Sequence, residues 1–184
     1  SAIRNGKISA KGLANWNNAA GPEKLVTWIE SHDTYANEGE TASLTNAQLR
    51  MGWAIITARA GGTPLFFNRP QGPEATQFPG VSQIGDKGND EFMHPEVVAV
   101  NKFRDAMVGE GEKFSNGTTR QTLIIERGNK GVVIVNLKDG TEQIKHKVGL
   151  ADGEYIDHAN GIKFKVQDGI LTGKIKASKI AVIY

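Results

Sequence analysis

Five Asn-Gly and Asp-Gly dipeptides divide the second part of the chain into short segments, and they restrict its fold more than any other feature. They are Asn116-Gly117, Asp139-Gly140, Asp152-Gly153, Asn160-Gly161 and Asp168-Gly169. Such dipeptides favour tight hairpin turns, because Asn, Asp and above all Gly tolerate positive φ. Between them lie short apolar segments, and Ile162–Val166 alternates cleanly between apolar residues and lysine. Residues 113–184 are therefore predicted to form an antiparallel sandwich of short strands.

Residues 1–112 show a different pattern, in which apolar segments of strand length alternate with segments of helical periodicity. Leu25–Ile29 is a continuous apolar run, which is typical of a strand covered on both faces, and Thr63–Phe67 is a second short apolar strand. Residues 45–61 and 95–109 carry apolar side chains at helical spacing. This order predicts two βα units. Two parallel strands cannot make a sheet core alone, so this part is expected to belong to something larger.

Local signals mark the start of each predicted helix. Thr45 and Gln48 can form a capping box, in which the hydroxyl accepts from a backbone N–H and the glutamine reaches back. Pro95 suits the first turn of the second helix, which makes His94 a helix-start residue. Trp53, on the apolar stripe of the first helix, is predicted to pack in the core, and so is Trp28.

Two polar segments are predicted to be loops. Residues 1–22 are rich in Asn, Gly and Ala and allow one helical turn, around Leu13–Asn17. Residues 68–94 form a longer loop, with four of the six prolines in or beside it: Pro70, Pro73, Pro79 and Pro95. Loops of this length inside compact domains are usually functional. Arg69, at its start, is expected to anchor the loop rather than to reach into a cleft.

The bulk composition excludes several kinds of site. The net charge is +2 with mixed signs, so no nucleic-acid-binding surface is expected. The absence of cysteine excludes disulfides and thiolate metal sites and fits a secreted bacterial protein. No run is long enough to span a membrane, and the first residues do not form a signal peptide, so an artificial or processing boundary is expected there. His146 and His158 are expected on the surface, and no histidines have metal-ligand spacing.

The strongest candidate for a functional site is Glu30-Ser31-His32-Asp33, directly after the apolar run. A strand there would deliver an imidazole and a carboxylate to its carboxyl end, where α/β enzymes place their ligand sites. Glu30 and Asp33 could form a catalytic pair, but strand alternation points Glu30 away from the face of Asp33. Glu30 is therefore favoured as a structural hydrogen-bond partner.

These residues resemble a known family. Trp28-Ile29-Glu30-Ser31-His32-Asp33-Thr34-Tyr35-Ala36-Asn37 resembles the last short motif of the alpha-amylase family of glycoside hydrolases, and Gly62–Phe67 resembles its eighth barrel strand. The tail resembles the domain that follows the barrel in bacterial secreted members. The resemblance implies an α/β then all-β fold, with the seventh and eighth units of a (β/α)8 barrel in residues 1–112 and an antiparallel Greek-key β-sandwich in residues 113–184.

The resemblance also implies a role for three residues in a retaining mechanism on alpha-1,4-linked glucans such as starch and maltooligosaccharides. Asp33 matches the carboxylate that stabilises the transition state, His32 a sugar-binding histidine, and Asn37 a more variable substrate contact. The nucleophile and the acid/base come from the fourth and fifth strands of the family's barrel, before this chain begins, so the chain alone is expected to be inactive. The family's calcium ligands also lie in earlier segments, so no metal site or other cofactor is expected here.

Other readings remain open. The chain could be a non-enzymatic carbohydrate-binding or assembly module, or its parent a transglycosylase or debranching enzyme. Aromatics in line on a strand face would favour a binding module, and the tail offers only Phe114, Tyr155, Phe164 and Tyr184, of which Phe164 is expected to face inward. Trp16 and Tyr35 could stack on sugar, although loop packing is favoured. A partial barrel exposes a strand edge and apolar faces, so self-association or binding of a complementary barrel fragment is expected.

Overall fold

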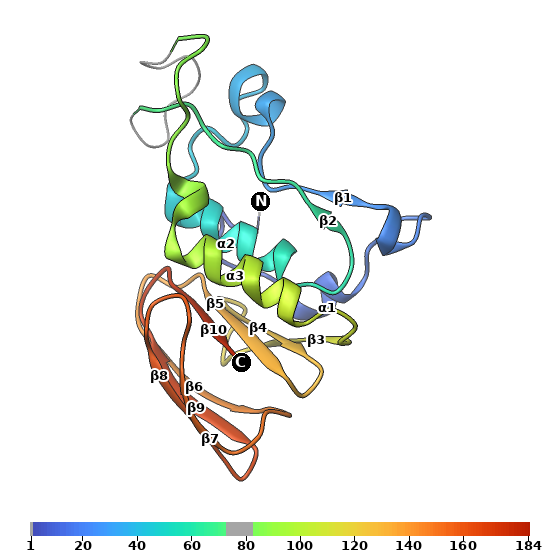
Figure 1. Cartoon of the computed structure of the whole chain (residues 1–184), viewed down its shortest axis with the longest axis vertical. Coiled ribbons are helices and arrows are strands. Elements are labelled where there is room, and N and C mark those ends of the chain that lie inside the picture. The colour runs from blue at the N-terminus through green and yellow to red at the C-terminus, as the bar shows by residue number, and fades with distance from the viewer. Residues whose placement is uncertain (1, 73–82) are drawn as a thin grey trace.

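The computed structural model describes residues 2–72 and 83–184, which form three stacked layers (Figure 1). Helices α2 (Asn46–Thr57) and α3 (Pro95–Ala106) make the first layer. Two four-stranded antiparallel sheets make the other two, and the helices cover the outer face of the nearer sheet. The coarse expectation of an α/β part followed by a β-rich part is therefore confirmed.

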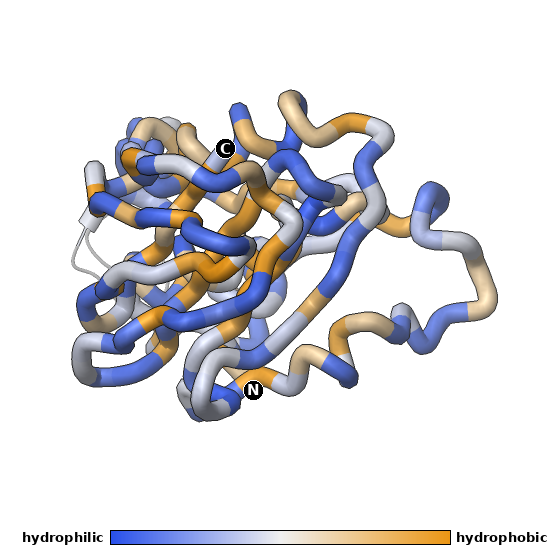
Figure 2. The backbone as a smooth tube through the Cα atoms, turned by 90° about the horizontal axis from the view of Figure 1, so that it is seen from below, coloured by the Kyte–Doolittle hydropathy of each residue, from blue (hydrophilic) through white to orange (hydrophobic). Residues whose placement is uncertain are grey.

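The two sheets contain all the strands of the second part of the chain. The sheet beneath the helices has the order β10-β5-β4-β3, with β3 Glu112–Asn116, β4 Thr122–Arg127, β5 Gly131–Asn136 and β10 Ile180–Ile183. The outer sheet has the order β6-β9-β8-β7, with β6 Glu142–Lys147, β7 Gly153–Ile156, β8 Lys163–Gln167 and β9 Ile170–Ile175. In Figure 2 the hydrophobic segments run through these stacked sheets, and the turns are mainly hydrophilic.

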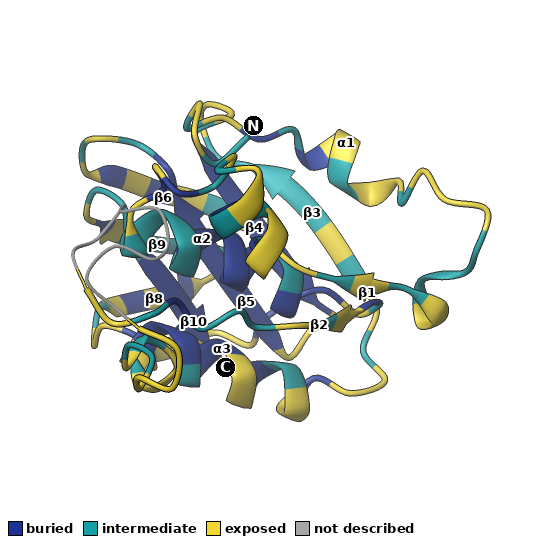
Figure 3. Cartoon of the chain, turned by 90° about the horizontal axis from the view of Figure 1, so that it is seen from above, coloured by how far each residue is buried: buried dark blue, intermediate teal, exposed yellow. Residues whose placement is uncertain are grey.

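The middle sheet supplies side chains to two separate cores. On β4, Leu123 and Ile125 pack with the helices, whereas Ile124 packs with the outer sheet. Every residue of β4 and β5 is buried, because this sheet has a layer on each side (Figure 3). The helices and the sheet β10-β5-β4-β3 thus share one core, although the boundary proposed after residue 112 falls at the first residue of β3.

The two parallel strands of the first part are shorter and more exposed than predicted. β1 is Val26–Thr27 and β2 is Thr63–Pro64, and they pair only with each other. Val26, Trp28 and Leu65 are more than half exposed, and both strands lie at the exposed side of the molecule in Figure 3. The prediction that Leu25–Ile29 is covered on both faces is therefore wrong, as is the core position of Trp28, because no element of the described chain packs over that face.

The predicted signals at the helix starts are confirmed. Thr45 and Gln48 form a capping box at α2. The side chain of His94 accepts a hydrogen bond from the backbone N–H of Glu96 at the start of α3, with Pro95 in the first turn. The predicted helical turn near the amino terminus is also present, but α1 spans Ala10–Ala14, because Ser9 caps it earlier than expected.

The turn dipeptides differ in geometry. Asp168 and Gly169 both have positive φ and join β8 to β9 in a two-residue turn, as predicted, and Gly161 also has positive φ. Gly117 and Gly140 do not have positive φ. Their connections are longer than two residues, so the strain that selects glycine in a tight hairpin is absent.

The long loop after β2 is only partly described. Its ends are held together by a bridge between Pro70 and Gly88, and a short helix, η3 (Glu91–Met93), precedes α3. Pro73 and Pro79 lie outside the described residues. Within the described part of the chain, no helix is long and apolar enough to cross a membrane.

Candidate functional site

The predicted site residues lie on a tight turn directly after β1. The helical turn η2 spans Asp33–Asn37, and His32 precedes it. The backbone N–H of Glu38 donates to the carbonyl of Asp33 at 2.8 Å. Ser31 starts the turn, since its N–H donates to the Thr34 hydroxyl at 2.9 Å. The N–H of Thr34 donates in return to the Ser31 hydroxyl at 3.3 Å. Strand alternation alone does not predict a turn held by these local side-chain hydrogen bonds.

The turn brings the three predicted residues together. The side-chain amide of Asn37 donates to Oδ1 of Asp33 at 2.7 Å, and Nε2 of His32 lies 3.4 Å from the same oxygen. The side chains of His32 and Asp33 are 77% and 55% exposed. Most of the carboxylate surface therefore faces solvent, where it can accept hydrogen bonds from a ligand.

A hollow begins beside this turn and extends to the long loop. Its wall includes His32, Asn37, Phe67 and Asn68, and its other side is formed by parts of residues 83–88. Asp33 is not part of this wall but belongs to the same turn. Strands β1 and β2 both end at this edge of the sheet, because they are parallel. The position agrees with the rule that ligands bind at the carboxyl ends of parallel strands.

Tyr35 is the buried member of the turn. Its ring packs against Phe67 at 5.8 Å between ring centroids and lies 4.9 Å from the guanidinium carbon of Arg69. Burial raises the pKa of Tyr35, partly offset by the positive charge of Arg69. The side chain is buried inside the loop and not free for a ligand, so the favoured prediction of loop packing is confirmed.

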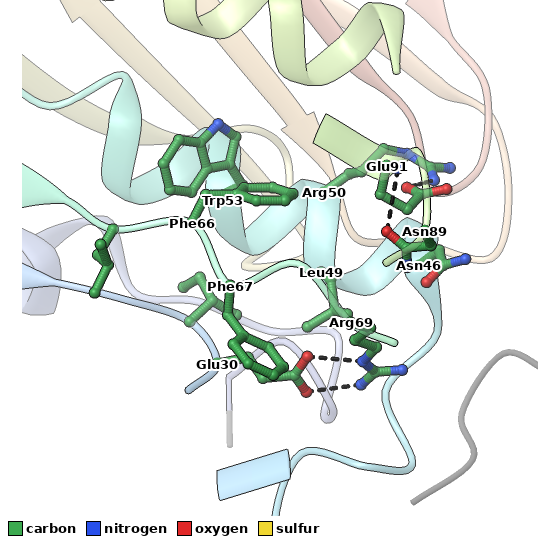
Figure 4. A pocket seen from close by; sticks show the side chains of 12 residues that line it. Glu30, Asn46, Leu49, Arg50, Trp53, Phe66, Phe67, Arg69, Asn89 and Glu91 are labelled. Carbon is green, nitrogen blue, oxygen red and sulfur yellow. Dashed lines mark hydrogen bonds and ion pairs between the residues drawn. The ribbon is translucent and has the colours of Figure 1, made fainter. Parts of the chain in front are cut away.

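Glu30 and Arg69 form a buried ion pair behind the turn (Figure 4). Nε and Nη2 of Arg69 donate to the two carboxylate oxygens of Glu30, both at 2.7 Å. Their side chains are 3% and 5% exposed. The predictions that Glu30 is structural and that Arg69 is an anchor are therefore both confirmed, but their pairing was not predicted because they are far apart in sequence.

Comparison with known proteins identifies the relatives of this chain. No family model matches it. It is 43% identical over 172 residues to an alpha-amylase of Butyrivibrio fibrisolvens, covering 89% of this chain and 18% of that protein. It is 37% identical over 182 residues to an alpha-amylase of Clostridium acetobutylicum, covering 97% of this chain and 22% of that protein.

The chain belongs to the alpha-amylase family. It spans about a fifth of the length of these curated relatives. Among solved structures, alpha-amylase I of Eisenia fetida matches 99% of this chain and 47% of its own, with a TM-score of 0.71 at 16% identity. A mutant of the same enzyme was solved with maltohexaose. At this identity the likeness shows a shared fold, and the two curated relatives show the family.

A second, more enclosed pocket of this alpha-amylase-family chain lies between α2 and the segment after β2 (Figure 4). Glu30 and Arg69 form one end of it. Arg50 forms the other, where it contacts Glu91 at 2.6 Å and the buried Glu96 at 3.0 Å. Trp53 lines the pocket and is buried as predicted. This pocket contains none of the three predicted site residues, and it shares Phe67 with the hollow beside the turn.

The remaining candidates for binding do not form a site. Within residues 2–72 and 83–184 no group of three or more His, Asp or Glu side chains could hold a metal ion. Trp16 packs under the guanidinium of Arg59 at 3.6 Å, which favours loop packing over sugar stacking. In the tail, Phe164 is buried as predicted, and Phe114 and Tyr155 are partly buried against the two cores. The exposed row of aromatics that a binding module would use is not present on residues 113–184.

Proposed function

We propose that this chain is the carboxyl-terminal part of a retaining alpha-amylase, in which Asp33 stabilises the transition state and His32 and Asn37 bind sugar hydroxyls. The observation that carries the proposal is the convergence of these three side chains on one exposed turn at the carboxyl ends of two parallel strands. The sequence identity to two alpha-amylases supports the family on which these roles rest. The hollow beside the turn offers space for a sugar ring.

The chemistry of glycoside hydrolysis gives Asp33 its role. The transition state resembles an oxocarbenium ion, and hydrogen bonds to a sugar 2-hydroxyl strengthen as it forms. A carboxylate that accepts those hydrogen bonds binds the transition state more tightly than the ground state. In this proposal Asn37 orients the carboxylate through its 2.7 Å hydrogen bond, and His32 donates to another hydroxyl.

A retaining mechanism also needs a nucleophile and an acid/base about 5–5.5 Å apart. The proposal assigns both to the fourth and fifth barrel strands of the parent protein, and it interprets β1-α2 and β2-α3 as the seventh and eighth units of a (β/α)8 barrel. Glu30 does not supply a missing carboxylate, because both of its oxygens are bonded to Arg69 and buried. The strand order β6-β9-β8-β7 supports the interpretation of the tail as a Greek key.

A hydrolysis assay tests the proposal that the nucleophile and the acid/base lie outside this chain. The purified chain, incubated with soluble starch, is expected to release no reducing sugar above a heat-treated control. In a titration with maltohexaose, NMR signals of His32 and Asn37 are expected to shift, and those of β4 are not. Turnover by the chain alone would overturn the assignment of the missing carboxylates, and an unchanged spectrum for the turn would contradict the glucan site.

The exposed face of β1 and β2 is a candidate surface for association with another protein chain. Val26, Trp28 and Leu65 are more than half exposed there, and the outer edges of both strands are unpaired within the described chain. Such edges and apolar groups favour association. The proposal therefore includes self-association or binding of a complementary barrel fragment. As separate parts, taken from the family resemblance, it includes secretion of the parent protein and calcium bound by the parent outside this chain.

The chief alternative is a carbohydrate-binding or assembly module without catalysis. A pull-down on insoluble starch separates it from the enzyme fragment. Retention that survives Asp33→Asn and His32→Ala would favour the module, whereas the enzyme fragment loses its affinity with either substitution. A transglycosylase or debranching parent shares the same turn, and the products of the parent protein would distinguish it from a hydrolase.

A further inference from the structure

Arg69 uses all three of its nitrogen atoms as donors. Nε and Nη2 bind the carboxylate of Glu30, Nη1 donates to the carbonyl of Leu44 at 2.9 Å, and Nη2 also donates to the carbonyl of Thr41 at 2.9 Å. The Arg69 side chain is only 5% exposed. Four of the five N–H groups of this guanidinium thus have an acceptor, and a buried guanidinium bonded in this way is held in one orientation by its planar fork.

The acceptors of Arg69 all belong to the segment that carries the candidate site. Glu30 lies at the start of this segment, and Thr41 and Leu44 lie at its end. The segment is closed internally by the N–H of Thr41, which donates to the carbonyl of Thr34 at 3.0 Å. Arg69 therefore fastens both ends of one loop, residues 30–44, to the segment that follows β2.

We infer that Arg69 is a positioning residue for the candidate site, acting through Glu30 and the loop carbonyls to set the place of Asp33 and His32. The chemical meaning of this role rests on the proposed function. Arg69 does not line the hollow beside His32, so it is not a catalytic residue. The guanidinium of Arg69 also lies over the ring of Tyr35, which belongs to the turn, and this contact gives a second connection to Asp33 that is independent of Glu30.

The ion pair of Glu30 and Arg69 is expected to fix the orientation of the loop of residues 30–44 more than to stabilise the fold. A buried ion pair gains little net stability over apolar side chains of similar size, because both charges lose their hydration. Removing one partner alone is costly, since it leaves an unpaired buried charge. The two roles can therefore be separated by replacing both partners at once with apolar residues.

Three variants test the inference: Arg69→Lys, Arg69→Met, and the double change Glu30→Leu with Arg69→Met. Hydrogen exchange is followed at the amides of Glu38 and Thr41, which are bonded within the loop, and at Ile124 and Ile134 as core controls. In Arg69→Lys and in the double variant, exchange at the loop amides is expected to be about tenfold faster or more, with the core amides unchanged. The double variant is expected to recover the thermal midpoint that Arg69→Met loses.

A purely structural ion pair predicts a different result. In that case the double variant would restore both the thermal midpoint and the loop protection, and the inference would be overturned. It would equally fail if Arg69→Lys left the loop amides protected. The lysine variant keeps the charge but replaces three donor nitrogens with one, so it cannot reproduce the bidentate bond to Glu30 together with the bonds to Thr41 and Leu44. It therefore separates the geometry of the fork from its charge.

A second readout reports on the site itself. The side-chain amide signals of Asn37 in the unmodified chain are compared by NMR with those in Asp33→Asn, which removes the carboxylate that this amide binds. Loosening the loop in Arg69→Lys is expected to move these signals toward their positions in Asp33→Asn. If the unmodified chain shows no response to maltohexaose, the proposed function fails, while the exchange results and the Asn37 signals still decide whether Arg69 positions the turn.

Discussion

Strands β4 and β5 bury every residue, whereas in the two-stranded sheet of β1 and β2 Val26, and Trp28 and Leu65 directly after the strands, are more than half exposed. The two regions also differ in what holds them. The sandwich is held by apolar side chains on both faces of the middle sheet. The region around the candidate site is held by polar anchors, chiefly the pair of Glu30 and Arg69.

This difference separates two effects: apolar burial stabilises the fold, and bidentate hydrogen bonds orient side chains. Apolar burial is non-directional, so it stabilises the sandwich without fixing any single side chain. Bidentate hydrogen bonds fix direction but add little stability when both charges are buried. The sandwich can therefore serve as a stable support, and the loop of residues 30–44 can present its side chains in a defined geometry.

The largest contrast is expected from the same substitution made in both regions. Leu171→Ala, in the core between the two sheets, is expected to destabilise the chain by about 2–5 kcal/mol, because Leu171 is fully buried. Leu65→Ala, on the exposed face of the short sheet, should cost about 0.5 kcal/mol or less. Urea unfolding of both variants measures the difference, and similar losses at the two positions would break the comparison.

The second largest loss of stability is expected from a substitution at Arg127, which connects the sandwich to the two helices. Buried Arg127 of β4 donates to the carbonyls of Ala58, at the end of α2, and of Met107, at the end of α3. Arg127→Met leaves these carbonyls without their donor and is expected to cost about 2–3 kcal/mol. Arg127→Lys serves as the control and should recover part of this loss. Thermal unfolding would contradict the prediction if both variants matched the unmodified chain.

The start of α3 is expected to make stability depend on pH. Burial, followed by the charge of Arg50, lowers the pKa of His94, whose ring accepts a hydrogen bond from the N–H of Glu96. A lowered pKa means that the folded chain prefers neutral His94. Its contribution is therefore complete above the ordinary pKa of about 6.5 and is lost as the pH falls from there through the folded-state value.

His94→Asn separates this effect from other titrations, since asparagine can cap the helix without a proton to gain. The loss of stability between about pH 6.5 and 5 is expected to be smaller in this variant than in the unmodified chain, by about 1 kcal/mol or less. Urea midpoints measured across that range provide the test. Parallel curves for the two proteins would show that His94 does not titrate in this way.

The smallest effect on stability is expected at the exposed face of the short sheet. Trp28→Lys should change the free energy of unfolding by about 0.5 kcal/mol or less, because half of the tryptophan is already exposed. It should nevertheless reduce association, since it places a charge on the face proposed to self-associate. Light scattering over a concentration series compares it with Lys102→Gln on α3, and equal association of the two variants would remove this face from consideration.

Local patterns were predicted well from the sequence. The caps at Thr45 and His94, the turn at Asp168-Gly169 and the grouping of His32 with Asp33 all depend on residues close together in the chain. The resemblance to alpha-amylases rested on two such local segments, residues 28–37 and 62–67, and on the tail, and the two curated relatives support it. Interactions between near neighbours are settled by backbone geometry and hydrogen bonding that the residue types already define.

The errors share one cause, which is that burial depends on what packs against a segment. Leu25–Ile29 has the apolar content of a covered strand, but no element of the described chain lies over Val26 and Trp28. Apolar content reports the tendency of a segment to be buried and does not identify its partner.

The sequence by itself determined the turn at Asp168-Gly169, the caps of α2 and α3 and the grouping of His32 with Asp33, because these follow from near neighbours. Only the tertiary structure decided that Glu30 pairs with Arg69, 39 positions away, and that this pair fastens the loop that carries Asp33. Many charged residues could have been the partner of Glu30. The fold selects one, because a buried carboxylate requires a donor that the backbone brings to it in the right orientation.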